Sequence, residues 1–92
     1  MAAAIGVASI AAAVVASAEP PAGAASCTGC HPASTRVTSP VPRLAGLDRA
    51  AIVRAMQDFR SGTRTATVMD RIAKGFTDEE IQAIAAWFAT QR

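Results

Sequence analysis

The pattern of apolar and polar positions predicts two longer helices in the second half of the chain. Between residues 48 and 61, apolar side chains recur at the three- and four-residue spacing of one helix face, and most charged side chains fall elsewhere. Asp48 before this stretch and Gly62 after it are residue types that favour the two caps of a helix. The apolar positions of this face are Ile52, Ala55, Met56 and Phe59.

The last helix has a sharper beginning. Thr77 and Glu80 have the spacing of a capping box, in which each side chain accepts a hydrogen bond from the other residue's backbone N–H. This spacing predicts a helix that begins directly after Thr77. Its apolar face consists of Ile81, Ile84, Ala85 and Phe88, with Trp87 beside it.

Shorter and irregular segments make up the rest of the domain. A short helix is expected over residues 24–31, ended by Pro32, and a helical turn over residues 68–74, ended by Gly75. Residues 19–25 are expected to be a loose leader, and residues 32–46 hold three prolines. No segment alternates with the period of a strand, so the sequence predicts an all-α fold of three to five short helices.

Residues 1–18 are uncharged and consist mainly of small or aliphatic side chains, and they end in an A-x-A pattern at residues 16–18. We therefore expect residues 1–18 to be a cleaved signal peptide and residues 19–92 to be one domain. The mature protein would be periplasmic, without stable membrane insertion. An uncleaved anchor is the alternative, although a bilayer span needs about 20 strongly apolar residues and this run is short and rich in alanine.

A domain this small rarely buries enough apolar surface to fold without a disulfide, a metal or a cofactor. A disulfide between Cys27 and Cys30 would close only a tiny loop, so a large apolar cofactor is the better source of the missing interior. The formal net charge is +2 and the charged residues are spread singly, so nothing indicates a nucleic-acid partner.

The motif that carries the chemistry is Cys27-Thr28-Gly29-Cys30-His31, the C-x-x-C-H signature of covalent haem attachment. On a helical turn, positions three and four apart share a face, so both thiols can reach one haem and His31 can reach its iron. The motif predicts one covalent haem c, bound by Cys27 and Cys30, with His31 as an axial ligand.

Three other uses of these residues compete with haem. A thioredoxin-like dithiol would follow a strand of an α/β domain, and no strand is predicted here. A structural zinc site needs four ligands, whereas the chain offers two Cys and one His. A simple disulfide would leave the small core unexplained. We favour haem over all three.

The iron needs a sixth ligand or an open position, and Met/His ligation is usual in electron-transfer cytochromes. Met69 lies in a connection and is favoured over Met56, which falls on the apolar face of a helix, where methionine is more often part of the core. Lys74 is a more remote choice. An open position would suit a gas-binding or catalytic haem, which nothing nearby indicates.

The second ring nitrogen of His31 needs a hydrogen-bond acceptor, which fixes the tautomer and orientation of the ring. A backbone carbonyl in the stretch from Pro40 to Pro42 is suited to this role. Leu44 would then pack on the haem face. An ordinary loop with one buried leucine is the alternative for Pro42 and Leu44.

With these residues in place, the chain resembles the class I cytochromes c over most of residues 24–90. The resemblance implies a small cytochrome c-like fold wrapped around one haem, with His31 and Met69 as axial ligands and the Pro42 carbonyl as acceptor for the His31 ring. It also implies that the C-terminal helix packs across the N-terminal one. The matching elements are C-T-G-C-H at 27–31, P-R-L-A-G at 42–46, D-F-R-S-G at 58–62, Met69, T-D-E-E-I at 77–81 and A-A-W-F-A at 85–89.

Within this class, residues 45–81 are most similar to the small cytochrome subunits of flavocytochrome c sulfide dehydrogenases. That resemblance implies a flavoprotein partner that oxidises sulfide and passes electrons to the haem, and this chain would catalyse no reaction alone. A free periplasmic shuttle between redox complexes is the alternative, although the chain lacks the lysine cluster with which shuttles often steer their encounters. A non-haem redox or disulfide protein is a third hypothesis.

Overall fold

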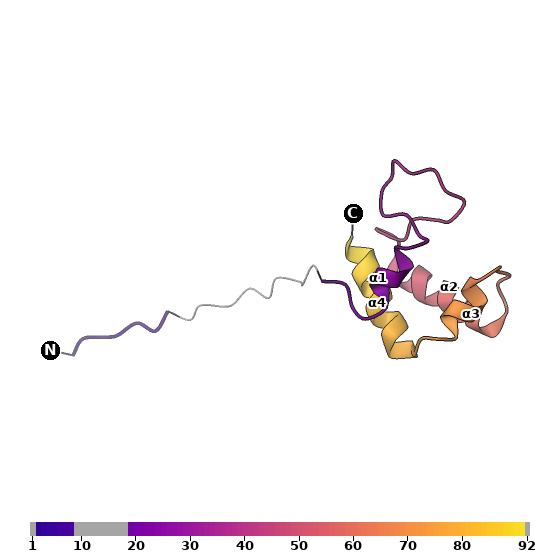
Figure 1. The fold of residues 1–92 in the computed structure, drawn as a ribbon. Coiled ribbons are helices and arrows are strands. Elements are labelled where there is room, and N and C mark those ends of the chain that lie inside the picture. Colours follow the sequence, from indigo (N-terminus) through magenta and orange to yellow (C-terminus); the bar gives the residue numbers. More distant parts are fainter. Residues whose placement is uncertain (1, 9–18, 92) are drawn as a thin grey trace.

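The computed structural model describes residues 2–8 and 19–91 (Figure 1). The described residues form four helices and no strand, which confirms the predicted all-α fold. The predicted signal peptide falls largely outside them, since positions 1 and 9–18 are not described. Within the described ranges, no helix is long and apolar enough to cross a bilayer. The helices are α1 (Ala24–Cys27), α2 (Arg49–Ser61), α3 (Met69–Ala73) and α4 (Asp78–Thr90).

Both longer helices begin where the sequence predicts. The Asp48 carboxylate accepts a hydrogen bond from the Ala51 N–H at 3.2 Å, and Gly62 ends α2 with a φ of 81°. At the start of α4, the Thr77 hydroxyl accepts from the Glu80 N–H and the Glu80 carboxylate accepts from the Thr77 N–H. These contacts satisfy N–H groups that have no partner within the helix, and so they fix both helix beginnings.

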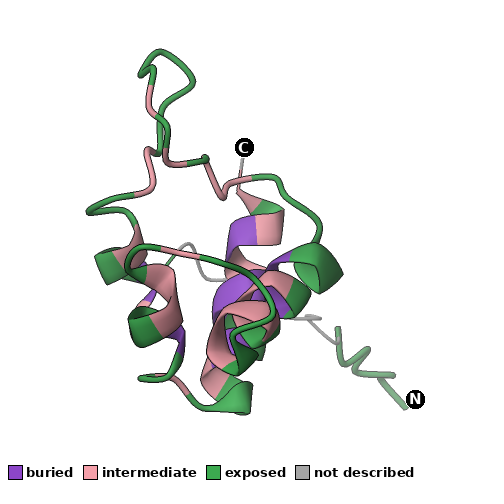
Figure 2. Ribbon diagram, turned by 90° about the vertical axis from the view of Figure 1, so that its right-hand side faces the viewer, coloured by how far each residue is buried: buried purple, intermediate pink, exposed green. Residues whose placement is uncertain are grey.

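The core lies where α2 packs against α4, and α2 also packs against α3 (Figure 2). The expected apolar face of α2 was partly wrong, because Ile52 is buried as predicted but the other buried position is Val53. Ala55 and Phe59 are only half-buried. Val53 belongs to the same core cluster as the buried residues of α4, so the buried side of α2 is the side that faces α4. The predicted apolar face of α4 is confirmed in full, since Ile81, Ile84, Ala85 and Phe88 are all buried.

The segment before the motif is packed more closely than expected. The regular part of α1 ends at Cys27, short of His31, but Ala24 is fully buried in one cluster with residues of α4. Gly23 has a φ of 88° and lies so close to Phe76 that an added Cβ would be 2.5 Å from the ring. The expected loose leader is therefore wrong from Gly23 onward, because small residues there allow α1 to approach α4.

Gly23→Ala is expected to lower the free energy of unfolding by about 2–5 kcal/mol. A side chain at positive φ costs about 1–2 kcal/mol, and forcing a methyl group into a packed ring costs about 1–3 kcal/mol. Gly62→Ala is the matched control, because Gly62 also has positive φ but its added Cβ would meet nothing within 4 Å. Denaturant unfolding of both variants measures the difference, and equal losses would contradict the close approach of Gly23 to Phe76.

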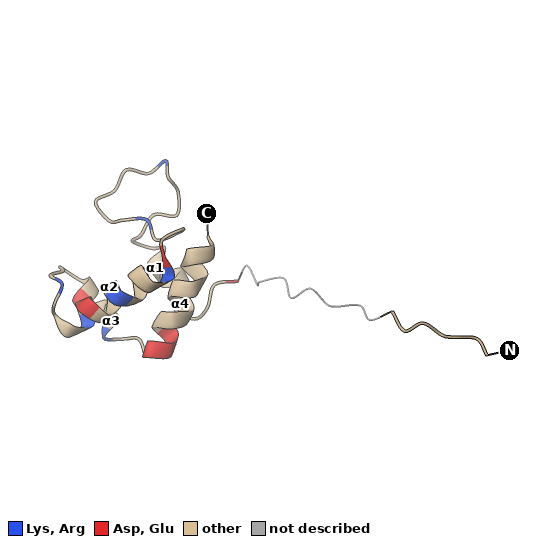
Figure 3. Cartoon of the chain, turned by 180° about the vertical axis from the view of Figure 1, so that it is seen from behind, with Lys and Arg blue, Asp and Glu red and all other residues tan. Residues whose placement is uncertain are grey.

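A salt bridge joins the end of α2 to the beginning of α4. The Arg60 guanidinium donates to the Asp78 carboxylate and, at 2.8 Å, to the Phe76 carbonyl. Acidic side chains gather at the start of α4, where the positive end of the helix dipole favours them, whereas basic side chains are distributed over α2, α3 and the loops (Figure 3).

Candidate functional site

The helical turn of α1 continues through the C-x-x-C-H motif as a hydrogen-bonded turn. The N–H groups of Cys30 and His31 both donate to the Cys27 carbonyl, at 3.2 and 2.9 Å. Pro32, which follows, has no N–H with which to extend this pattern. The structure therefore brings both thiols and the imidazole together on one turn, as the spacing predicts.

The two thiols lie in different surroundings. Cys27 is half-buried, packs against the core cluster and donates a weak hydrogen bond to the Gly23 carbonyl at 3.5 Å, whereas Cys30 is exposed. Burial raises the pKa of the Cys27 thiol above its usual range, and a backbone hydrogen bond offsets part of that rise. Burial therefore favours the neutral form of the Cys27 thiol.

One nitrogen of the His31 ring is committed to the backbone. Nδ1 lies 2.5 Å from the carbonyl oxygen of Pro42. Because a carbonyl oxygen only accepts, Nδ1 carries the proton and donates, which leaves the lone pair of Nε2 free to bind a metal. The hydrogen bond expected from the sequence is thus present, and it selects the tautomer that an axial ligand requires.

The stretch from Pro42 to Gly46 is held against α4. The Gly46 N–H donates to the Phe88 carbonyl at 2.9 Å, and Leu44 is half-buried against the core cluster. A small hollow of about 110 Å³ lies between this stretch and the motif. It is lined by Thr28, His31, Pro32, Ala33, Leu44, Ala45, Trp87, Phe88 and Gln91.

Met69 lies apart from this group as the first residue of α3 and is half-buried. Its role as an iron ligand stays a prediction. Met56 packs against the core cluster, as the sequence favoured. Lys74 is exposed at the end of α3.

Two residues near these positions were not singled out from the sequence as site residues. Trp87 lines the small hollow beside His31, and its Nε1 is buried without a hydrogen-bond partner in the described part of the chain. One carboxylate oxygen of Asp70, the residue directly after Met69, is also buried without a hydrogen-bond partner among the described residues. Only the position of Asp70 beside the predicted ligand could have drawn attention to it.

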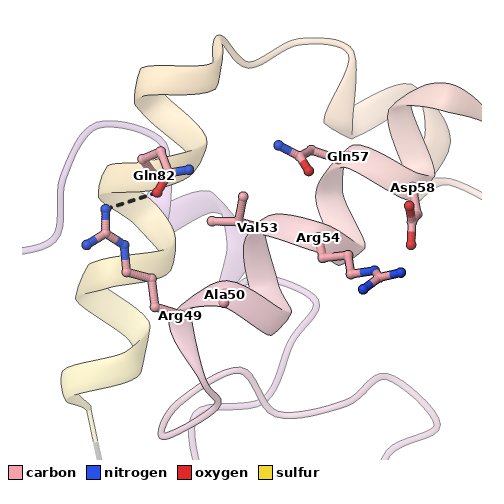
Figure 4. A pocket seen from close by; sticks show the side chains of 7 residues that line it. All are labelled: Arg49, Ala50, Val53, Arg54, Gln57, Asp58 and Gln82. Carbon is pink, nitrogen blue, oxygen red and sulfur yellow. Dashed lines mark hydrogen bonds between the residues drawn. The ribbon is translucent and has the colours of Figure 1, made fainter.

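A larger hollow of about 490 Å³ lies on the surface between α2 and α4 (Figure 4). Arg49 crosses it to donate to Gln82 at 2.9 Å. It contains none of the predicted site residues, so we do not assign the cofactor to it. Its lining residues are Arg49, Ala50, Val53, Arg54, Gln57, Asp58 and Gln82.

The residues present fit a covalent haem. Two thiols and an imidazole with a free Nε2 form the donor set that a c-type haem uses. Around the start of α3, Val68 is 50% exposed and Ile72 is 38% exposed, which is apolar surface that a porphyrin would cover. The core of the described residues contains no large side chain that is completely buried, so the polypeptide by itself forms only a small interior.

An all-α fold of short helices with a C-x-x-C-H turn and an imidazole oriented by the backbone defines a c-type cytochrome. No family model matches the chain. A cytochrome c-554(548) from Halomonas halodenitrificans is 30% identical over 69 residues, which are 71% of this chain and 83% of that protein. The chain belongs to the class I cytochromes c, whose cofactor is haem c and whose function is electron transfer.

Two further relatives are redox-enzyme partners by name. The cytochrome subunit of sulfide dehydrogenase from Chlorobaculum tepidum is 46% identical over 63 residues, covering 68% of this chain and 57% of that protein. A thiosulfate dehydrogenase electron acceptor from Stutzerimonas stutzeri is 40% identical over 65 residues, covering 68% of this chain and 30% of that protein. The chain thus spans less than two thirds of the length of these two relatives.

Proposed function

We propose that this chain is the haem-bearing electron-transfer subunit of a periplasmic flavoprotein that oxidises sulfide. The observation that carries the proposal is the C-x-x-C-H turn whose His31 Nδ1 donates to the Pro42 carbonyl. Residues 1–18 would direct export and be removed, and residues 19–92 would form the haem-binding domain. The identity of 46% to a sulfide dehydrogenase cytochrome subunit supports this partner.

Each site residue has a separate task. Cys27 and Cys30 would hold the haem through two thioethers, each made by adding a thiol S–H across one vinyl group. His31 would bind the iron through Nε2, and Met69 would supply a thioether sulfur as the second protein ligand. Leu44 and the Pro42 stretch would lie against the haem and exclude water from it. The bound haem iron supplies one-electron chemistry, alternating between ferric and ferrous states.

The distribution of charge favours a bound subunit over a diffusing shuttle. Shuttles often use a patch of one sign to steer encounters with several partners, and Figure 3 shows the two signs distributed over the same molecule. A partner that holds the chain permanently needs no long-range steering.

The proposal is tested by isolating the protein from its native source and adding sulfide. We expect it to copurify with a flavoprotein, and we expect its haem to be reduced by sulfide only in the presence of that partner. If sulfide reduced the haem at the same rate without the flavoprotein, the proposed transfer of electrons from the flavoprotein to this chain would be contradicted.

A free shuttle is the second candidate. It is favoured by the identity of 40% to a protein named as a thiosulfate dehydrogenase electron acceptor. A monomer on gel filtration from the native source, with no flavoprotein attached, would support this candidate over the first.

A further inference from the structure

The loop that separates His31 from Pro42 is closed at its base by two side-chain contacts, that of His31 with the Pro42 carbonyl and a second one from Arg43. The Nε of Arg43 donates to the Ala33 carbonyl at 3.1 Å, directly beside the contact between His31 and Pro42. Beyond Ala33 the loop stands away from the helices (Figure 1). Hydrogen bonds that both begin and end inside residues 33–41 span at most three residues. Nothing in the loop itself therefore holds its two ends together.

Arg43 is linked to the His31 imidazole through its peptide bond with Pro42 and through the hydrogen bond from Nδ1 to the Pro42 carbonyl. The Pro42 carbonyl that accepts from His31 belongs to the peptide unit that leads into Arg43. An exposed loop with few contacts opens easily, and each opening would move that carbonyl away from Nδ1. A charge-assisted hydrogen bond from Arg43 to the opposite end of the loop resists this opening.

We propose that Arg43 is a positioning residue that holds the Pro42 carbonyl against His31 Nδ1 and thereby sets the electron donation of the imidazole to the iron. The inference rests on the proposed function, since it takes His31 as the axial ligand. A hydrogen bond from Nδ1 makes Nε2 a stronger donor, which stabilises ferric iron and lowers the reduction potential. Loosening that bond raises the potential.

The test must separate the contact from the charge of Arg43. Glutamine places an amide nitrogen at the position along the side chain that Arg Nε occupies, whereas methionine places no donor there. Arg43→Gln and Arg43→Met both remove the positive charge, so they differ in the donor. Arg36→Met removes one charge from the same loop at an exposed residue whose guanidinium makes no hydrogen bond or ion pair in the described residues.

Two readouts on the haem-loaded ferrous protein decide the question. The first readout is the exchange rate of the His31 Nδ1 proton with solvent, measured by NMR. In Arg43→Met this rate is expected to rise about tenfold, because one charge-assisted hydrogen bond is lost. Arg43→Gln keeps a neutral donor at the same position, so its exchange rate is expected to lie between those of Arg43→Met and the unchanged protein. Arg36→Met leaves the base of the loop untouched and is expected to match the unchanged protein. The midpoint potential of Arg43→Met is expected to lie above that of Arg43→Gln.

The outcomes distinguish the inference from the proposed function. Equal exchange rates and equal potentials in Arg43→Met and Arg43→Gln, with haem attached and His31 bound, would overturn the positioning role alone. A protein whose haem is not covalent, or whose iron is not bound by His31, would overturn the proposed function itself. A change in thermal stability without a change in potential would reduce Arg43 to a structural contact and also overturn the inference.

Discussion

Cys27→Ala and Cys30→Ala are each expected to reduce the yield of haem-loaded protein by tenfold or more. Each substitution removes one of the two thioethers. It also weakens the binding of the haem, which a domain this small needs to complete its apolar core. The yield is measured as haem that stays on the polypeptide in a denaturing gel, relative to total protein.

Thr28→Ala is the matched control for both cysteine variants. Thr28 lies between the two cysteines, is exposed, and its hydroxyl makes only a local hydrogen bond to the Ala25 carbonyl at 2.7 Å. It is expected to load haem normally. A cysteine variant that loads as much covalent haem as Thr28→Ala would contradict the assignment of that thiol.

Met69→Ala is expected to remove the absorption band that arises from the bond between sulfur and iron and to lower the reduction potential. A thioether ligand stabilises ferrous iron, so its loss favours the ferric state. The haem is expected to stay attached, because the thioethers at Cys27 and Cys30 do not involve Met69. Visible spectroscopy of the ferric protein and a redox titration measure the two effects.

Met56→Ala is the comparison that tests the choice between the two methionines. Met56 packs against the core cluster, so this variant is expected to keep the band and the potential and to lose about 2 kcal/mol of unfolding free energy. Loss of the band in Met56→Ala, with the band kept in Met69→Ala, would reverse the ligand assignment.

The parts of the fold set by local chemistry could be predicted from the sequence. Asp48, Gly62 and the pair Thr77 and Glu80 act within one turn of the chain, so their hydrogen bonds can be predicted from residue type and spacing. The buried face of α4 follows from periodicity in the same way. The C-x-x-C-H turn is also local, and its spacing was sufficient to place both thiols and the imidazole together.

The features that were missed depend on residues distant in the chain. Gly23 and Ala24 were expected to be loose because their partners, Phe76 and α4, lie at the other end of the domain. Val53 is buried in a cluster with α4, and the periodicity of α2 alone does not show which of its sides that helix covers. The contact of Arg43 with Ala33 depends on how a proline-containing loop returns to its beginning.

The pyridine haemochrome spectrum of the purified protein, after extraction with acidified organic solvent, tests the central claim most directly. Our account predicts that the haem stays with the polypeptide, with one haem per chain and the spectrum of a haem bound through two thioethers. A colourless protein that is nevertheless well folded, or one that releases all its haem into the solvent, would contradict the account.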